Sequence, residues 1–172
     1  MHPRLEHLYT DLEKQREKLL TPLRELKNEK LNHHLSEKWS INQIIAHLIA
    51  AERLSVMYLN KKMQGAETAE DTGLAEDIKM LLLIASQRLP MKFKVPKVVL
   101  ENTSQERDFK KLELEWISVR ADLKKTLNSV KATHLKRKIY KHVRAGMLNI
   151  QHAVKFLREH VGHHIPQIKK QL

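Results

Sequence analysis

The sequence contains no cysteine and has few glycines, prolines and aromatic residues. Without cysteine there is neither a disulfide framework nor a thiolate metal ligand, so any metal must be held by nitrogen and oxygen atoms. Four glycines and five prolines in 172 residues are too few for the turns of an all-β fold. Aromatic residues make up 5% of the chain, so stacking platforms for single-stranded nucleic acid are scarce.

Long apolar runs are missing as well. The N-terminus has no apolar signal core, and no run approaches the length that spans a membrane. We therefore expect a cytoplasmic protein without a membrane partner, and the absence of cysteine fits a reducing compartment. The chain is 41% hydrophobic and 30% charged, which is too apolar for disorder. Its length predicts a single domain over residues 1–172.

The formal net charge is +12. Between Arg120 and Arg144, seven further lysines and arginines face a single acid, Asp122. Such a stretch can hold an anionic ligand or a phosphate backbone. A solvated helix end and loop is the commoner origin of a charge run, and no helix-turn-helix pattern accompanies this one. We therefore do not expect a nucleic-acid partner.

Apolar residues recur at helical intervals along most of the chain and predict four long helices. The long patterns cover residues 3–30, residues 41–64 after Ser40 as N-cap, residues 103 or 104 to about 127, and residues 147 or 149 to 172. A shorter helix is predicted at residues 74–89, between the second and third. With no strand pattern, the fold class is all-α, a four-helix bundle with a short extra helix between helices 2 and 3.

The remaining segments are predicted as connections. Residues 65–73 are polar, and residues 134–146 form a basic loop. Pro90 and Pro96 bracket a segment, residues 91–100, that we expect to be extended because proline disfavours helix before it.

Three histidines are the strongest functional signal. His160 and His164 are four residues apart, so they share one face of a helix, and both flank its apolar stripe. His47 flanks the apolar stripe of the second helix. A single histidine in such a place is more often a core residue than a ligand, but three that can converge would leave several buried nitrogens without partners. His152 and His163 point away from the stripe and are expected to face solvent.

A metal held by three imidazoles keeps a position open for water or substrate, as in reactive rather than structural sites. The chemistry of the residues leaves this metal site and a packed, metal-free cluster both open. Eleven histidines also make one pair at i and i+4 expected by chance.

Two segments resemble the signatures of the DinB/YfiT-like superfamily. They are WSINQIIAHLIAAE at residues 39–52 and HVGHHIPQI at residues 160–168. His142, Gly146 and the run FLRE at residues 156–159 also resemble the family's approach to its last helix. With the order and length of the helices, the resemblance covers nearly the whole chain, and the combined pattern is more specific than either half.

The resemblance implies a four-helix bundle that binds a divalent cation through His47, His160 and His164. Nickel, zinc, iron and manganese all suit such a site. It further implies a transfer of low-molecular-weight thiols to electrophiles, or thiol-assisted isomerisation. The chain departs from the family where His142 is followed by valine instead of the frequent proline. It also carries Pro166 inside the last helix, where we expect a mild kink.

Other residues are candidates for supporting roles. Gln167, one turn beyond His164, can accept the second ring N–H of a ligating imidazole or contact a bound ligand. Gln43 and Glu52 are weaker candidates for that role, and Glu52 is expected to be a paired structural acid. Trp39 is interpreted as packing the entry of the second helix. Basic residues near the middle of the charged stretch can attract the carboxylates of an anionic thiol: Lys136, Arg137, Lys138 and Lys141.

The leading hypothesis is a metal-dependent thiol S-transferase that acts on a small-molecule substrate, with no catalytic residue assigned. Its thiol must arrive as a cofactor, because the chain has none. The alternative is a non-catalytic bundle that binds a metal or small molecule and dimerises through a helical face; a homodimer is expected. A hydrolase that uses metal-activated water and a DNA-associated protein are less favoured.

Overall fold

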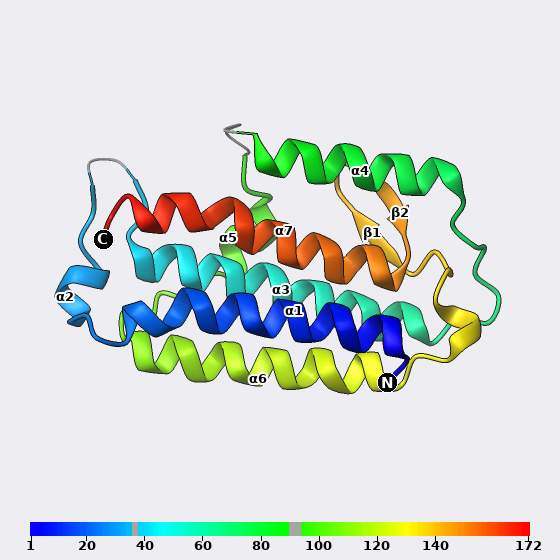
Figure 1. The fold of residues 1–172 in the computed structure, drawn as a ribbon, viewed down its shortest axis with the longest axis horizontal. Helices are drawn as coiled ribbons and strands as arrows, with labels where there is room; N and C mark the ends of the chain where they lie inside the picture. The colour runs from blue at the N-terminus through cyan, green and yellow to red at the C-terminus, as the bar shows by residue number, and fades with distance from the viewer. Residues whose placement is uncertain (36–37, 90–93) are drawn as a thin grey trace.

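The computed structural model describes residues 1–35, 38–89 and 94–172. The described chain is mostly helical, and its long helices lie side by side along the molecule (Figure 1). The long helices are α1 (Pro3–Leu20), α3 (Ile41–Met63), α6 (Phe109–Asn128) and α7 (Ile150–Lys169). The other elements are η1 (Thr21–Leu23), α2 (Asn28–Leu31), α4 (Leu74–Arg88), α5 (Lys97–Asn102), η2 (Ala132–His134), β1 (Tyr140–His142) and β2 (Gly146–Leu148). The predicted all-α fold class, with an extra helix between the second and third long helices, is confirmed.

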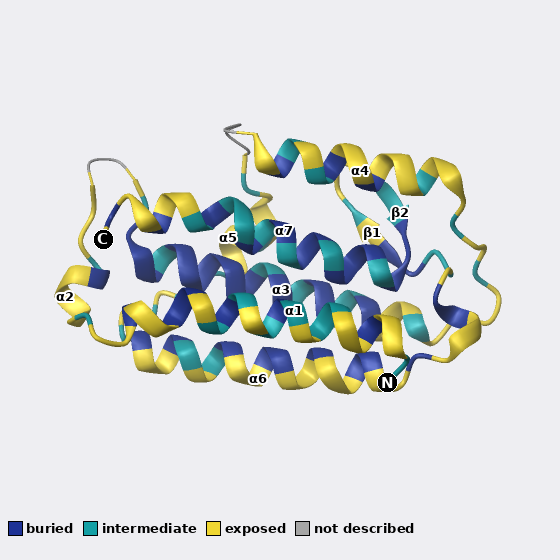
Figure 2. Ribbon diagram, in the orientation of Figure 1, coloured by how far each residue is buried: buried dark blue, intermediate teal, exposed yellow. Residues whose placement is uncertain are grey.

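The core lies where the four long helices face one another. α3 packs on α6 and α7, and α1 packs on α7 and α6. Their inner faces are buried and their outer faces exposed (Figure 2). Trp116, Leu12 and Ile45 are among the side chains fully removed from solvent. Burial of each aliphatic side chain of this size contributes about 1.5–3 kcal/mol, which is what holds an amphipathic helix in the bundle.

Of the two helices that carry the histidines, α3 begins at the predicted residue, and α7 begins at Ile150, one residue after the later of its two predicted starts. Ser40 caps α3 in a capping box: its hydroxyl accepts the Gln43 N–H, and the Gln43 side-chain oxygen accepts the Ser40 N–H. Asn149 caps α7 by accepting the His152 N–H. These side chains satisfy backbone donors that a helix start leaves without partners. α7 continues through Pro166 to Lys169, so the proline does not end the helix.

Two predicted helix boundaries are wrong. The first helix ends at Leu20 rather than Lys30, because Pro22 has no N–H to donate to the next helical turn. The third long helix begins at Phe109, not at residue 103 or 104. The Asp108 carboxylate accepts the N–H groups of the first turn, while the Glu106 carboxylate accepts two N–H groups upstream of it. Such local side-chain bonds stabilise turns in competition with helix.

The basic loop contains a two-stranded hairpin that the sequence did not predict. β1 and β2 pair antiparallel, with Tyr140 opposite Leu148 and His142 opposite Gly146. Gly146 has φ of 73°, the left-handed conformation that glycine adopts without strain and that closes short hairpin loops. The His142 ring stabilises the turn, because its Nδ1 accepts the N–H groups of Arg144 and Ala145.

The segment predicted to be extended, residues 91–100, is only partly described, because residues 91–93 lie outside the described residues. Within its described part, α5 begins at Lys97, directly after Pro96. The extended prediction is therefore wrong for residues 97–100: proline disfavours helix in the residue before it but is well suited to a helix start.

The extra helix α4 lies along the outer side of α7 (Figure 1). It covers His152, whose side chain is buried and whose Nε2 lies 3.0 Å from Asp77 Oδ1. The prediction that His152 faces solvent is therefore wrong. His163 is half-buried, with its Nδ1 2.8 Å from the Gln87 carbonyl oxygen near the end of α4. Among the described helices, none is long and apolar enough to cross a membrane.

Candidate metal centre

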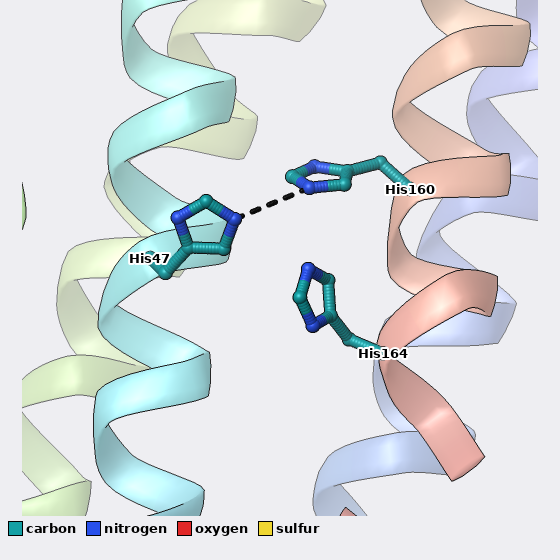
Figure 3. A group of neighbouring side chains, drawn as sticks. All are labelled: His47, His160 and His164. Atoms are coloured by element: carbon teal, nitrogen blue, oxygen red, sulfur yellow. Dashed lines mark hydrogen bonds between the residues drawn. The ribbon is translucent and has the colours of Figure 1, made fainter. Parts of the chain in front are cut away.

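Three histidine rings meet where α3 packs on α7 (Figure 3). His47 comes from α3, and His160 and His164 come from successive turns of α7. One ring nitrogen of each lies within 4.8 Å of one ring nitrogen of each of the others. The structure therefore brings together the three histidines that the sequence singled out, although His47 and His160 are 113 positions apart in the sequence.

His47 is fixed from both sides of its ring. α3 is anchored by buried isoleucines and leucines around it, which leaves only 4% of His47 exposed. The Trp39 ring covers it at 5.1 Å between centroids, and its Nε2 lies 3.3 Å from the Nε2 of His160. Its Nδ1 is buried and has no hydrogen-bond partner among the described residues. Packing, rather than a hydrogen bond at Nδ1, thus sets the direction of the Nε2 lone pair.

The two rings from α7 have different supports. The Nδ1 of His164 lies 3.0 Å from the side-chain oxygen of Gln167. Because that oxygen only accepts, Nδ1 carries the proton, and Nε2 is left as the acceptor that faces the cluster. The ring of His160 stacks on Phe156, with centroids 5.5 Å apart and planes at 10°. Gln167 thus lies where the sequence placed an acceptor, whereas Phe156 was recognised only as part of the resemblance.

All three imidazoles are neutral near pH 7. Burial lowers the pKa of His47 to about 4 and that of His164 to about 3, and it holds the pKa of His160 well below its ordinary value. Neighbouring imidazoles add to the lowering of the pKa: His164 and His47 at His160, and His47 at His164. The cluster is therefore rich in lone pairs and poor in protons, which is the state that a cation needs of its ligands.

The donor set fits a divalent transition metal. Three neutral imidazoles suit zinc, nickel, iron and manganese, and within the described parts of the chain the cluster contains no carboxylate that would complete a closed site. Three ligands leave coordination positions for exogenous molecules. Without a cation, the facing Nε2 atoms of His47 and His160, 3.3 Å apart, can share only one proton, whereas a cation can accept both lone pairs.

His142 lies behind the cluster rather than in it. Its ring packs 4.5 Å from that of Phe156, which separates it from His160. Burial lowers the pKa of His142 to about 4, and its Nδ1 is already an acceptor for the hairpin turn. His142 therefore links the hairpin to the ring that supports His160. Its spacing in the sequence gave no signal of this role.

The basic residues proposed for anion binding fall into two groups. Arg137 and Lys138 are tied to the connection before α4: Arg137 pairs with Asp71 at 3.4 Å, and Lys138 pairs with Glu70 at 3.0 Å. Lys136 and Lys141 are exposed. Side chains alternate along a strand, so Lys141 faces away from the side of β1 that carries His142.

The weaker candidates for supporting the imidazoles have structural roles. Gln43 completes the cap of α3. Glu52 is 2% exposed, accepts the Trp116 Nε1–H at 3.0 Å, and forms an ion pair with Arg120. The expectation that Glu52 is a paired structural acid is therefore confirmed.

Comparison with known proteins agrees with this geometry. Searches of curated proteins and of solved structures give no significant match. A family model described as the DinB superfamily matches residues 11–168, which include α3, α7 and all three clustered histidines. Because the match covers most of the chain, this protein belongs to the DinB superfamily.

Proposed function

We propose that His47, His160 and His164 bind one divalent metal ion, and that the protein uses it to transfer a low-molecular-weight thiol to a small electrophile. The observation that carries the proposal is the convergence of three neutral ring nitrogens within 4.8 Å of one another. Membership of a superfamily that is generally metal-binding supports the site. The choice of a thiol rests on the resemblance, because a fold alone does not fix a reaction.

A metal held in this way supplies Lewis acidity, which lowers the pKa of a coordinated thiol or water. The surrounding side chains hold the ligands ready for it. Gln167 keeps the proton of His164 on Nδ1, and Phe156 fixes the plane of His160. Trp39 covers His47 and keeps water from its buried side. Such preorganisation avoids the cost of arranging the ligands at each turnover.

The thiol must come as a second substrate, because the chain contains no cysteine. In an addition to an electrophilic carbon, the sulfur–carbon bond forms and the proton of the thiol passes to the product. The net charge of +12 attracts anionic thiols over long range. Exposed Lys136 and Lys141, with Arg137 and Lys138 beside them, are proposed to contribute to that attraction.

One observation favours a second candidate, a metal-binding bundle without catalysis. Glu159, the acid next to His160 in the sequence, is engaged by Arg88 and Arg158. Burial also keeps the clustered imidazoles from protonation. The described surroundings of the cluster therefore provide few groups that can exchange a proton with a substrate. A hydrolase that uses the same site with water shares this difficulty.

The first test is elemental analysis of protein purified without an affinity tag. We expect about one equivalent of a divalent metal in the wild type and less than about a tenth in His160→Ala, since two imidazoles hold a cation far more weakly than three. His7→Ala is the matched control, because His7 lies exposed on α1. A metal-free wild type after incubation with nickel, zinc, iron or manganese would contradict the site.

The second test separates catalysis from binding. Loaded protein is assayed for conjugation of a panel of low-molecular-weight thiols to chlorodinitrobenzene and to maleate. Turnover that disappears in His160→Ala and persists in His7→Ala supports the transferase. Full metal content without turnover for any pair of substrates supports the non-catalytic bundle instead.

A further inference from the structure

The outer face of α4 is an apolar surface. Five large aliphatic side chains are each more than half exposed on it or directly after it: Leu74, Ile78, Leu81, Leu82 and Leu89. The opposite face of the helix carries Met80 and Leu83, which are buried, and α4 packs on α7. Figure 2 shows this contrast, with exposed residues along the outside of α4. We call these five residues the α4 stripe.

The spacing of the α4 stripe is that of a helix–helix contact. Leu74, Ile78, Leu81 and the exposed Ala85 follow one another at intervals of four, three and four residues. This is the repeat that places side chains as knobs into the holes of a facing helix. Among the other exposed aliphatic residues, Val143 lies in the hairpin loop, and Leu114, Ile117 and Ala121 form a shorter series on α6. Exposed contiguous apolar patches of this kind mark contact surfaces.

Charge indicates what the α4 stripe contacts. α4 carries two acids, Glu76 and Asp77, and two bases, Lys79 and Arg88, so its formal charge is zero in a chain of net charge +12. Two copies of this basic protein repel each other elsewhere, and α4 is where repulsion is least. The acids lie in the first turn of α4 and Arg88 in its last turn. These charges already have partners within the chain, Asp77 beside His152 and Arg88 beside Glu159, so a second copy meets a surface with little net charge.

We propose that the protein forms a symmetric homodimer in which α4 packs antiparallel against α4 of a second copy. A two-fold axis near Leu81 and Leu82, the middle of the stripe, makes Leu74 face Leu89 of the other chain. A self-complementary patch of this type closes on itself and does not lead to filaments. A helix of this length is about 22 Å long, so the contact lies at the small end of specific interfaces. We expect a dissociation constant on the order of 10 μM.

Sedimentation equilibrium tests the dimer directly. The wild type should be mostly dimeric at about 100 μM and dissociate on dilution, whereas Ile78→Glu/Leu81→Glu should bind at least about 100-fold more weakly, because it buries charges in an apolar seam. Leu114→Glu is the control, since Leu114 and Leu81 are equally exposed, at 66%, on different helices. A wild type that stays monomeric at about 100 μM overturns the proposal, as does an equal effect of Leu114→Glu.

The orientation is tested with engineered disulfides, which the absence of native cysteine makes unambiguous. Under mild oxidation, two chains that both carry Leu81→Cys should form a disulfide with each other across the two-fold axis. Two Leu74→Cys chains should not form a disulfide with each other. A Leu74→Cys chain should form one with a Leu89→Cys chain when the two variants are mixed. Self-coupling of Leu74→Cys indicates a parallel pair and overturns the proposed arrangement.

Two further measurements test whether a second copy, rather than a membrane, covers the α4 stripe. Raising the salt concentration should strengthen the dimer, because it screens the repulsion between two basic proteins. Wild type that remains monomeric and binds vesicles of neutral phospholipid through the stripe would contradict the proposal. The helical circular dichroism of every variant is measured as well, so that dissociation of the dimer can be distinguished from unfolding of the chain.

Discussion

Two polar clusters lie inside the same bundle, and α3 contributes to both. Towards α6, Glu52 accepts the Trp116 N–H and pairs with Arg120, which in turn reaches Glu13 at 2.9 Å. Towards α7, His47 meets two further histidines. The first cluster joins acids with bases. The second consists of bases alone, with one outside acceptor, Gln167, at its edge.

This difference separates a structural polar cluster from one suited to a ligand. Opposite charges compensate each other's desolvation, so the charges of the Glu52 cluster are paired within the protein. Three neutral imidazoles offer more acceptors than donors and gain most from a cation. A buried group of one chemical kind is thus a better sign of a binding site than buried polarity by itself.

The largest change in stability is expected when the cluster of Glu52, Arg120 and Glu13, which we call the closed cluster, loses its central acid. Glu52→Leu leaves Arg120, which is 1% exposed, with the partly exposed Glu13 as its one ion-pair partner among the described residues. We expect a loss of about 3–5 kcal/mol in the free energy of unfolding, measured by urea denaturation of the metal-free protein. Glu115→Leu breaks the exposed pair with Arg53 and should cost about 1 kcal/mol or less. Equal losses in both variants would contradict the comparison.

The three histidines, which we call the open cluster, should contribute little to the stability of the metal-free protein. His47→Leu replaces a buried imidazole whose Nδ1 has no partner among the described residues with an apolar side chain. We expect the free energy of unfolding to change by less than about 1 kcal/mol, or to rise. Urea denaturation of chelator-treated protein measures it. A loss as large as that of Glu52→Leu would mean that the histidines form a structural unit by themselves.

Metal should stabilise the fold only through the open cluster. A divalent ion at about 100 times its dissociation constant adds about 2.7 kcal/mol to the free energy of unfolding. Thermal unfolding with zinc or nickel, and again after a chelator, should show this gain in the wild type and in Glu115→Leu. In His164→Ala the gain should be absent. An unchanged gain in that variant would place the metal elsewhere.

The pH dependence of the metal-free protein should report the buried histidines. The pKa of His47 is about 4 and that of His164 about 3 in the folded state, against an ordinary value of 6.5. Below pH 6.5 these histidines become protonated in the unfolded chain but stay neutral in the folded state. The free energy of unfolding therefore falls as the pH drops towards 4. At pH 5 the loss is about 2 kcal/mol for each such histidine. In urea denaturation at pH 7 and pH 5, His47→Leu should lose less than the wild type; an identical loss would contradict the assignment.

A further effect, on metal affinity alone, is expected at the edge of the histidine cluster. Gln167→Leu removes the acceptor that holds the His164 proton on Nδ1, without removing a ligand. Metal affinity should fall about 10- to 100-fold, measured by competition with a coloured chelator. Gln151→Leu changes another amide of α7, one that donates to the Leu135 carbonyl instead, and should leave affinity unchanged. Equal effects of the two variants would assign Gln167 no part in the site.

Features fixed by neighbouring residues were predictable from the sequence. The start of α3 is set by Ser40 and Gln43, three residues apart. The shared direction of His160 and His164 follows from helix periodicity. The convergence with His47 needed the packing of α3 on α7, which the bundle fold and the resemblance together suggested.

Features that depend on distant packing or on competing local signals were missed. His152 is buried only because α4 covers its side of α7, which periodicity within α7 does not reveal. The start of α6 was misplaced because several side chains that can cap a helix lie close together, and Asp108 is the one that does so. The hairpin was missed because its strands have three residues each, too short for an alternating pattern.

The distance in sequence between His47 and the pair on α7 also orders events during biosynthesis. Of the three clustered imidazoles, only His160 and His164 are close in an unfolded chain, and His47 is 113 positions away from His160. We therefore expect complete coordination of the metal to follow the docking of α3 on α7. The colour of cobalt depends on its coordination. During refolding in the presence of cobalt, we expect the absorption of the three-histidine site to appear only when α3 has docked on α7.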